Sequence, residues 1–181
     1  MAYKNLLVSL DGTKSNAKRV QVALDLAERF DAHLVGLYVN PEIIIPSYVM
    51  AGIPEAVQRD QRAARKAEAE RILGDFEKAA KRAGRSIECR GASGPAEDIP
   101  EIIGLHGRYA DLVILGQYDG DDPESPSRDT IERTLLTVGR PCLLVPYIGA
   151  PAVIGRRVVV AWDAGRESAR AAYDSLPFLQ A

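Results

Sequence analysis

The chain repeats its opening phrase near its end. Residues 4–12 read KNLLVSLDG, an apolar run that ends in an acid and a turn, and residues 156–164 read RRVVVAWDA. Counted from Asp11 to Asp163, the two phrases lie 152 residues apart (163 − 11). A repeat of this length indicates one structural unit per period. The sequence therefore predicts a complete domain in residues 1–147, a linker over 148–155, and the first strand and helix of a second, truncated domain in 156–181.

The second unit is too short to enclose a core of its own. The chain is thus expected to be a fragment of a longer tandem protein, or a degenerate tandem. An apolar strand without neighbours is an association hazard. We therefore expect residues 156–180 to dock on the first domain, to pair with their copy in another chain, or to be completed by further residues.

Within residues 1–147, short apolar runs alternate with helical patterns. The strands are expected at residues 6–10, 33–39, 86–90, 111–115 and 142–145, and the helices at 16–30, 55–83, 95–106 and 129–138. Continuous apolar runs are typical of parallel strands buried on both faces. The pattern predicts an α/β fold, a five-stranded parallel open sheet with helices on both faces. Ligands bind such sheets beyond the carboxyl ends of the strands, so the site is expected at residues 11–12, 39–40, 91–95 and 116–130.

Composition excludes several classes of function. The formal net charge is −2, with no basic stripe, so nucleic acid is not an expected partner. No apolar run approaches the roughly 20 residues needed to cross a bilayer, so no membrane contact is expected and the predicted location is cytoplasmic. Cys89 and Cys142 lie in apolar runs and are expected to be free, buried thiols. His33 and His106 lack partners at metal-ligand spacing, so no metal site is predicted.

Several short motifs, in their order and spacing, give the chain a family resemblance. They are KNLLVSLDG at 4–12 with Ser15 and Ala17 behind it, Val39 at the end of the second strand, Gly94-Pro95 after the third, DLVILG at 111–116, and RPCLLVP at 140–146. Together they resemble the universal stress protein family, over essentially the whole chain. The resemblance implies a Rossmann-like fold of the adenine nucleotide alpha hydrolase-like type. It also implies a homodimer paired through the fifth strand, or intramolecular pairing with a second domain.

The resemblance also implies a nucleotide site. Nucleotide-binding members carry Gly, two residues, Gly, nine residues, then Gly-Ser or Gly-Thr, and such glycines let backbone N–H groups approach phosphate oxygens. Gly116 fits the first position, but the second falls on Asp119 and the final pair on residues 129–130. Counting back from residues 140–141 shifts the final pair by one residue and restores no glycine. The candidate nucleotide or anion site comprises Asp11, Val39, Gly94, Gly116, Ser127 and Thr130.

The substitutions in the phosphate loop matter electrostatically. Residues 119–124 carry four carboxylates, and a unit-charge repulsion at about 4 Å costs roughly 1 kcal/mol in water. ATP or AMP thus remains a possible ligand, with tight triphosphate binding disfavoured by Asp119 and Asp129 unless a magnesium ion bridges the charges. The alternative is a solvated acidic loop in which Asp129 caps the following helix and Glu132 completes a capping box. The role of Asp11 has two equal alternatives: it forms part of an adenosine pocket, or it caps the first helix.

The segment Ile43–Ile53 is apolar yet punctuated by Pro46 and Gly52. It leaves the expected ligand edge of the sheet. It is expected either to pack over the domain's own core or to form a lid or an interdomain contact, because exposed apolar patches rarely go unused.

Three functions remain open at this stage. The favoured one is a universal stress protein that acts as a non-catalytic stress-response regulator through dimerisation or partner binding, with weak or absent nucleotide binding. The alternative is an ATP- or AMP-binding regulatory protein. A nucleotide-hydrolysing enzyme is the third, and it is disfavoured because no catalytic base or metal cluster can be named from the sequence.

Overall fold

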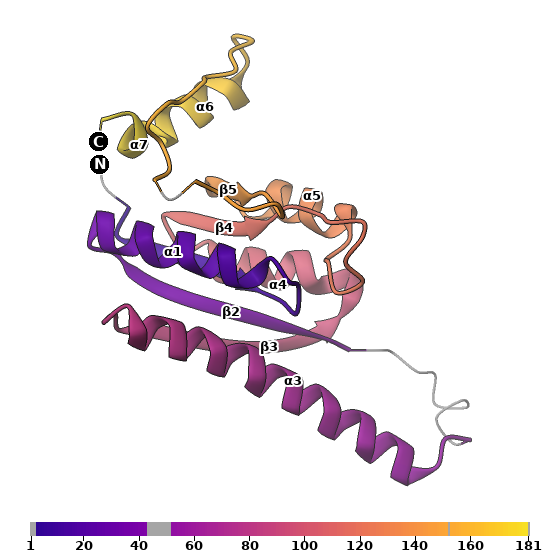
Figure 1. Cartoon of the computed structure of the whole chain (residues 1–181). Coiled ribbons are helices and arrows are strands. Elements are labelled where there is room, and N and C mark those ends of the chain that lie inside the picture. The colour runs from indigo at the N-terminus through magenta and orange to yellow at the C-terminus, as the bar shows by residue number, and fades with distance from the viewer. Residues whose placement is uncertain (1–2, 43–51, 152, 181) are drawn as a thin grey trace.

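A five-stranded parallel sheet forms the centre of the computed structural model, which describes residues 3–42, 52–151 and 153–180 (Figure 1). The strands are β1 (Asn5–Leu10), β2 (His33–Glu42), β3 (Ile87–Pro95), β4 (Leu112–Gly116) and β5 (Cys142–Val145). Their order is β3-β2-β1-β4-β5, and every adjacent pair is parallel. The predicted α/β class and sheet are confirmed.

The central strand β1 lies between β2 and β4. Leu6 pairs with Leu34 on one side and with Leu112 on the other, and all three side chains are buried. From β1 the chain builds the sheet first towards β3 and later towards β5, so the strand order reverses between β1 and β4. This switch point is where sheets of this kind bind ligands, at the carboxyl ends of the strands.

Helices cover both faces of the sheet. On one face, α1 (Asn16–Phe30) and α3 (Glu55–Arg82) pack on Leu6, Val8 and Leu10, the alternate residues of β1. On the other face, α4 (Ile99–Gly107) and α5 (Arg128–Thr137) cover a second cluster that includes Leu7. The alternation of strand side chains between the two faces produces these two cores, and Figure 1 shows α1 and α4 on opposite sides of the strands.

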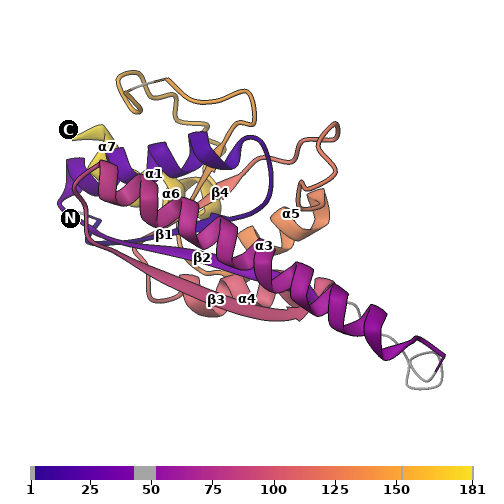
Figure 2. The ribbon, with the colours of Figure 1, turned by 60° about the horizontal axis from the view of Figure 1, so that its bottom comes forward.

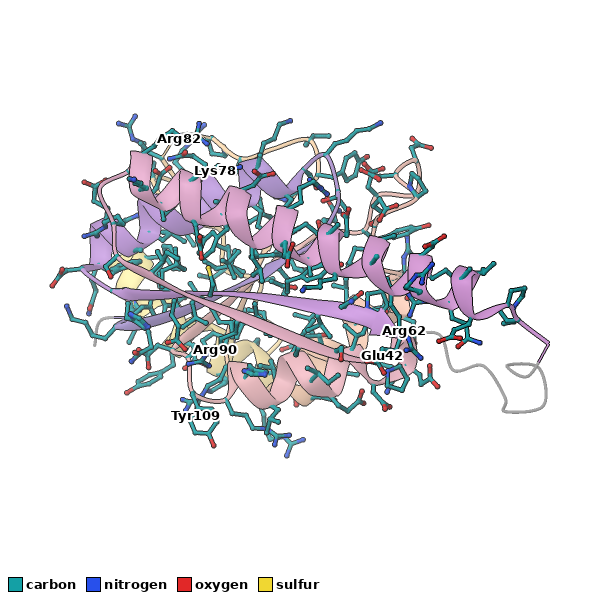
Figure 3. All side chains as sticks on the ribbon, turned by 90° about the horizontal axis from the view of Figure 1, so that it is seen from below. Glu42, Arg62, Lys78, Arg82, Arg90 and Tyr109 are labelled. Atoms are coloured by element: carbon teal, nitrogen blue, oxygen red, sulfur yellow. The ribbon has the colours of Figure 1, made fainter. Side chains whose placement is uncertain are left out.

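The helix α3 runs past the end of the sheet (Figure 2). Its buried residues, Ile72, Phe76 and Ala80, all lie in its second half. On the overhanging half, Arg62 lies near Glu42 at the end of β2, in a groove that both residues line (Figure 3). No helix in the described part of the chain is long and apolar enough to cross a membrane.

Two strands extend further than their apolar runs indicated. β2 and β3 remain paired at their carboxyl ends, where Asn40 lies opposite Ser93 and Glu42 lies opposite Pro95. Residues 91–95, expected beyond the end of the third strand at the ligand edge, therefore belong to that strand, because the backbone ladder continues where the apolar pattern stops. The next helix begins with a 3-10 turn, η1 (Ala96–Asp98), before α4. Of the apolar segment 43–53, residues 43–51 lie outside the described residues.

The C-terminal repeat is only partly formed as predicted. The expected helix is present as α6 (Arg166–Asp174), followed by α7 (Leu176–Leu179). The expected strand over residues 158–162 is not formed, and the side chain of Val159 is 94% exposed. A strand needs a neighbour for its N–H and C=O groups, and none of the described residues pairs with this segment. Whether residues 156–181 begin a second domain stays a prediction.

The helices α6 and α7 nevertheless dock on the first domain, beside Tyr3 before β1 and Phe30 at the end of α1. The ring of Phe178 lies 5.5 Å from that of Tyr3 and 5.6 Å from that of Phe30, and Tyr3 donates a hydrogen bond to the backbone oxygen of Asp174. Aromatic pairs at these separations stabilise packing beyond the area they bury. One of the three expectations for this segment, docking on the first domain, is thus met by its helices.

Candidate functional site

A cavity of about 370 Å³ lies at the carboxyl ends of β1, β2 and β4, next to the switch point. Its walls come from the turn after β1, the ends of β2 and β4, the loop before α5, and the first turn of α5. Ile103, Leu115 and Ile131 contribute apolar surface. A larger groove of about 670 Å³ between α1 and α3 shares only Asp11 and Gly12 with this cavity. An apolar cavity with a few convergent polar groups is typical of a small-molecule site.

Five of the six predicted site residues line this cavity. They are Asp11, Val39, Gly116, Ser127 and Thr130. Gly94 does not line it: Gly94 pairs with Pro41 inside the sheet, and a Cβ built there would lie 2.6 Å from Cδ1 of Ile102. Gly94 thus packs closely against the end of the Ile102 side chain in α4.

The first turn of α5 presents two hydroxyl groups to the cavity. Ser127 is the N-cap, and its Oγ accepts a hydrogen bond from the backbone N–H of Thr130 at 3.1 Å. The two hydroxyl oxygens lie 2.9 Å apart. The predicted cap, Asp129, is wrong: its side chain is 78% exposed and lies 3.9 Å from Arg133. Hydroxyl groups at a helix N-terminus are well suited to an anion, because the exposed N–H groups carry partial positive charge.

Asp11 is held by a buried arginine. Nη2 of Arg19 lies 2.6 Å from Oδ2 of Asp11, with the Arg19 side chain only 2% exposed. Oδ1 of Asp11 accepts a hydrogen bond from the backbone N–H of Thr13 at 3.0 Å. Asp11 lines the cavity and orders the turn before α1, but it does not cap α1, whose N-cap is Ser15; its part in an adenosine pocket stays a prediction. Its negative charge is offset by the guanidinium.

Arg19 also explains why residue 116 is glycine. A Cβ built on Gly116 would lie 1.9 Å from Nη1 of Arg19. Nε of Arg19 finds no hydrogen-bond partner in the described part of the chain. Arg19 is not among the site residues predicted from the sequence, although its spacing to Ala23 and Leu26 (i, i+4, i+7) puts it in phase with the buried face of α1.

The acidic loop before α5 is folded onto the turn after β1. Asp122 is 8% exposed, and its two oxygens accept hydrogen bonds from the backbone N–H groups of Lys14 at 3.0 Å and Glu124 at 3.1 Å. These hydrogen bonds hold the pKa of Asp122 below its usual value. Asp119 does not line the cavity, and its Oδ1 accepts a hydrogen bond from the N–H of Asp121 at 3.1 Å.

Carboxylate groups lie near Tyr38, at the β2 side of the cavity. Burial raises the pKa of the Tyr38 hydroxyl, and the carboxylates of Glu68 and Glu124 raise it further. Tyr38 and Glu124 both line the cavity. Among the residues that the structure describes, no three His, Cys, Asp or Glu side chains form a group that could hold a metal ion. The arrangement can bind and orient a polar ligand through hydroxyl groups, one charge-balanced carboxylate and one unbalanced carboxylate.

Known proteins resemble this chain in sequence pattern and fold. The universal stress protein family model matches residues 2–136. A universal stress protein family structure from Burkholderia pseudomallei is 25% identical with a TM-score of 0.57, over 80% of this chain and 96% of that one. No curated protein matches.

Two further structures of the same fold contain nucleotides. A universal stress protein in complex with cAMP is 20% identical with a TM-score of 0.54, over 81% of this chain and 99% of that one. The universal stress protein from Archaeoglobus fulgidus in complex with dAMP is 15% identical with a TM-score of 0.54, over 80% and 98% of the two chains. At these identities the two structures show the fold.

Proposed function

This chain belongs to the universal stress protein family, and we propose that it is a non-catalytic regulatory protein that binds an adenine nucleotide in the cavity at the carboxyl ends of β1, β2 and β4. The observation that carries the proposal is the convergence of five candidate residues on one cavity at the switch point. These residues come from four separate segments of the chain, so their convergence is a product of the fold. The sequence favoured a role with little nucleotide binding, and the cavity supports the nucleotide-binding alternative instead.

The proposed ligand carries few phosphate charges. Related structures hold cAMP and dAMP, and each of these nucleotides has a single phosphate. Ser127 and Thr130 supply two hydroxyl groups at one helix N-terminus, which suits one phosphate. Asp119 and Asp129, the residues expected to disfavour a triphosphate, do not line the cavity. Any discrimination against ATP must therefore come from another residue.

Pairing with a second domain or a second copy is a separate part of the proposal. β5 is an edge strand, and apolar side chains are exposed in the segments before and after it, with Leu136 of α5 85% exposed and Ile148 76% exposed. Exposed apolar side chains beside an open strand edge favour association. Sedimentation velocity over a micromolar concentration range tests this part: a single monomeric species throughout would contradict it.

Calorimetric titration with AMP tests the nucleotide site. Thr130→Val removes a hydroxyl group while keeping the shape of the side chain, and it is expected to weaken AMP binding about fivefold to tenfold, the value of one hydrogen bond. Thr137→Val on the same helix is the matched control, because the Thr137 hydroxyl bonds to the backbone oxygen of Arg133 and does not line the cavity. The proposal fails if neither AMP nor cAMP binds the wild-type chain, or if both variants bind equally well.

A further inference from the structure

We propose that Glu124 is the residue that makes this cavity prefer ligands with few phosphate charges, and that Asp122 holds Glu124 in position. The inference rests on the proposed nucleotide function. It replaces Asp119 and Asp129, which the phosphate motif singled out, with a residue that the motif does not mention.

Charge balance around the cavity singles out Glu124. The acidic residues that line the cavity are Asp11 and Glu124. Arg19 lies 2.6 Å from Asp11 and offsets its charge. Glu124 forms no ion pair with any residue that the structure describes. Glu124 is thus the uncompensated negative charge of the cavity wall.

The carboxylate of Glu124 lies close to the turn after β1. A Cβ built on Gly12 would lie 3.1 Å from Oε2 of Glu124 and 3.2 Å from Oε1 of Glu68. Glu68 is itself balanced by Arg71 at 2.6 Å. Glu124 precedes Ser127 by three residues, so their Cα atoms lie at most roughly 11 Å apart. A phosphate bound by the hydroxyl groups of α5 is therefore within electrostatic range of Glu124.

Asp122 fixes this arrangement through its two carboxylate oxygens. Oδ2 accepts the hydrogen bond from the backbone of Lys14, in the turn after β1, and Oδ1 accepts the one from the backbone of Glu124. One side chain therefore ties the loop to the turn and also orders the backbone of Glu124. Pro123, between the two acids, restricts the backbone further because its φ is fixed.

The other acids of this segment are poorly placed to act on the ligand. Asp119, Asp121 and Asp129 do not line the cavity. Glu124 is exposed to solvent, as Asp121 and Asp129 are, so water and salt screen all three charges. Glu124 differs from the other two because it forms part of the cavity wall.

The test compares ATP and AMP affinities by calorimetry in EDTA, for Glu124→Gln and for the controls Asp129→Asn and Asp121→Asn. All three changes remove one negative charge and preserve side-chain shape. ATP carries about two more charges than AMP. At about 8 Å from Glu124 and an effective dielectric of about 40, each additional phosphate charge changes the affinity about sixfold. Glu124→Gln is expected to raise the ATP-to-AMP affinity ratio roughly thirtyfold, and the controls less than about twofold.

Asp122→Asn supplies a nucleotide-free readout. Loss of the carboxylate should speed hydrogen exchange at the Lys14 amide, because that N–H donates directly to Asp122. The same variant should shift the ATP-to-AMP ratio in the direction of Glu124→Gln, by a smaller factor. Unchanged exchange at Lys14 would overturn the role assigned to Asp122.

The outcomes separate this inference from the proposed function. AMP binding with an unchanged ATP-to-AMP ratio in Glu124→Gln would overturn the inference and leave the nucleotide site standing. Absence of any nucleotide binding in wild type and variants would overturn both. The titrations repeated with Mg²⁺ give a further outcome: if Glu124→Gln then weakens ATP binding, Glu124 is a metal ligand and the repulsive role is wrong.

Discussion

Replacing Gly116 with alanine is expected to destabilise the protein through Arg19, a residue 97 positions away in the chain (116 − 19). The added Cβ would lie 1.9 Å from Nη1 of Arg19 and 3.1 Å from its Cζ, so the guanidinium must move. Moving it breaks the 2.6 Å contact with Asp11, in a place where the arginine is 2% exposed. Breaking a buried ion pair typically costs about 3–5 kcal/mol. We expect Gly116→Ala to lower the free energy of unfolding by roughly 3 kcal/mol, at the low end because Asp11 is 14% exposed.

The double variant Arg19→Ala, Gly116→Ala isolates the cause. Arg19→Ala alone should also cost roughly 3 kcal/mol, because it leaves Asp11 without its cation. Once Arg19 is truncated, the new Cβ has space, so the double variant should be no less stable than Arg19→Ala alone. The expected coupling energy is therefore about 3 kcal/mol, at the upper end of values for residues in contact.

Urea unfolding followed by circular dichroism measures these differences by linear extrapolation. Gly74→Ala is the control, because a Cβ there meets nothing within 4 Å and residue 74 lies inside α3. That change should stabilise the protein by roughly 0.5–1 kcal/mol. The reasoning is refuted if Gly116→Ala costs less than about 1 kcal/mol, or if the two changes add within about 0.5 kcal/mol.

Three smaller predictions concern the loop and the thiols. Ser127→Ala removes the cap of α5 and should cost about 1 kcal/mol in urea unfolding; no loss would contradict the assigned cap. The folded-state pKa of Asp122 lies below its usual 3.8. The ionised carboxylate therefore stabilises the fold above pH 3.8, and this stabilisation is lost as the pH falls through the lowered pKa. Asp122→Asn should flatten the acid limb of stability against pH, and an unchanged limb would count against these hydrogen bonds. Burial raises the pKa of Cys89 and Cys142 to about 11, so iodoacetamide should alkylate both slowly at pH 8 until urea unfolds the chain, whereas fast labelling of the folded protein would show accessible thiolates.

The sheet could be predicted because its strands are continuous apolar runs. β5 matched its predicted bounds, and β1 and β4 differed by single residues at their ends. β2 and β3 are longer than predicted. The polar and glycine residues at their ends stay in the strands because the two backbones pair with each other there. The strand over residues 158–162 failed for the opposite reason: its apolar pattern is strong, but the described chain offers it no neighbour.

The site residues could be predicted only where they follow directly from their place at the end of a strand. The ends of parallel strands meet at one edge of the sheet, so Asp11, Val39 and Gly116 were found together. The fold of the acidic loop depends on which carboxylate reaches which backbone N–H, and sequence spacing does not determine that. Glu124 lines the cavity and Asp122 bonds to the turn after β1, whereas Asp119 and Asp129, which the motif singled out, do not line the cavity. The burial of Arg19 likewise depends on its partner Asp11, since a lone buried guanidinium would be too costly.

The central position of β1 has a consequence for how the chain reaches its native state. Its partner β4 lies 106 residues later, counted from Leu6 to Leu112 (112 − 6). During synthesis, β1 and β2 can meet early, but one edge of the central strand stays open until more than half of the chain has been made. Folding rates fall as native contacts become more distant in sequence. Leu7 and Val8 are thus exposed in partly folded chains for longer than any local pairing would allow, and this interval is when aggregation or chaperone binding competes most strongly with folding.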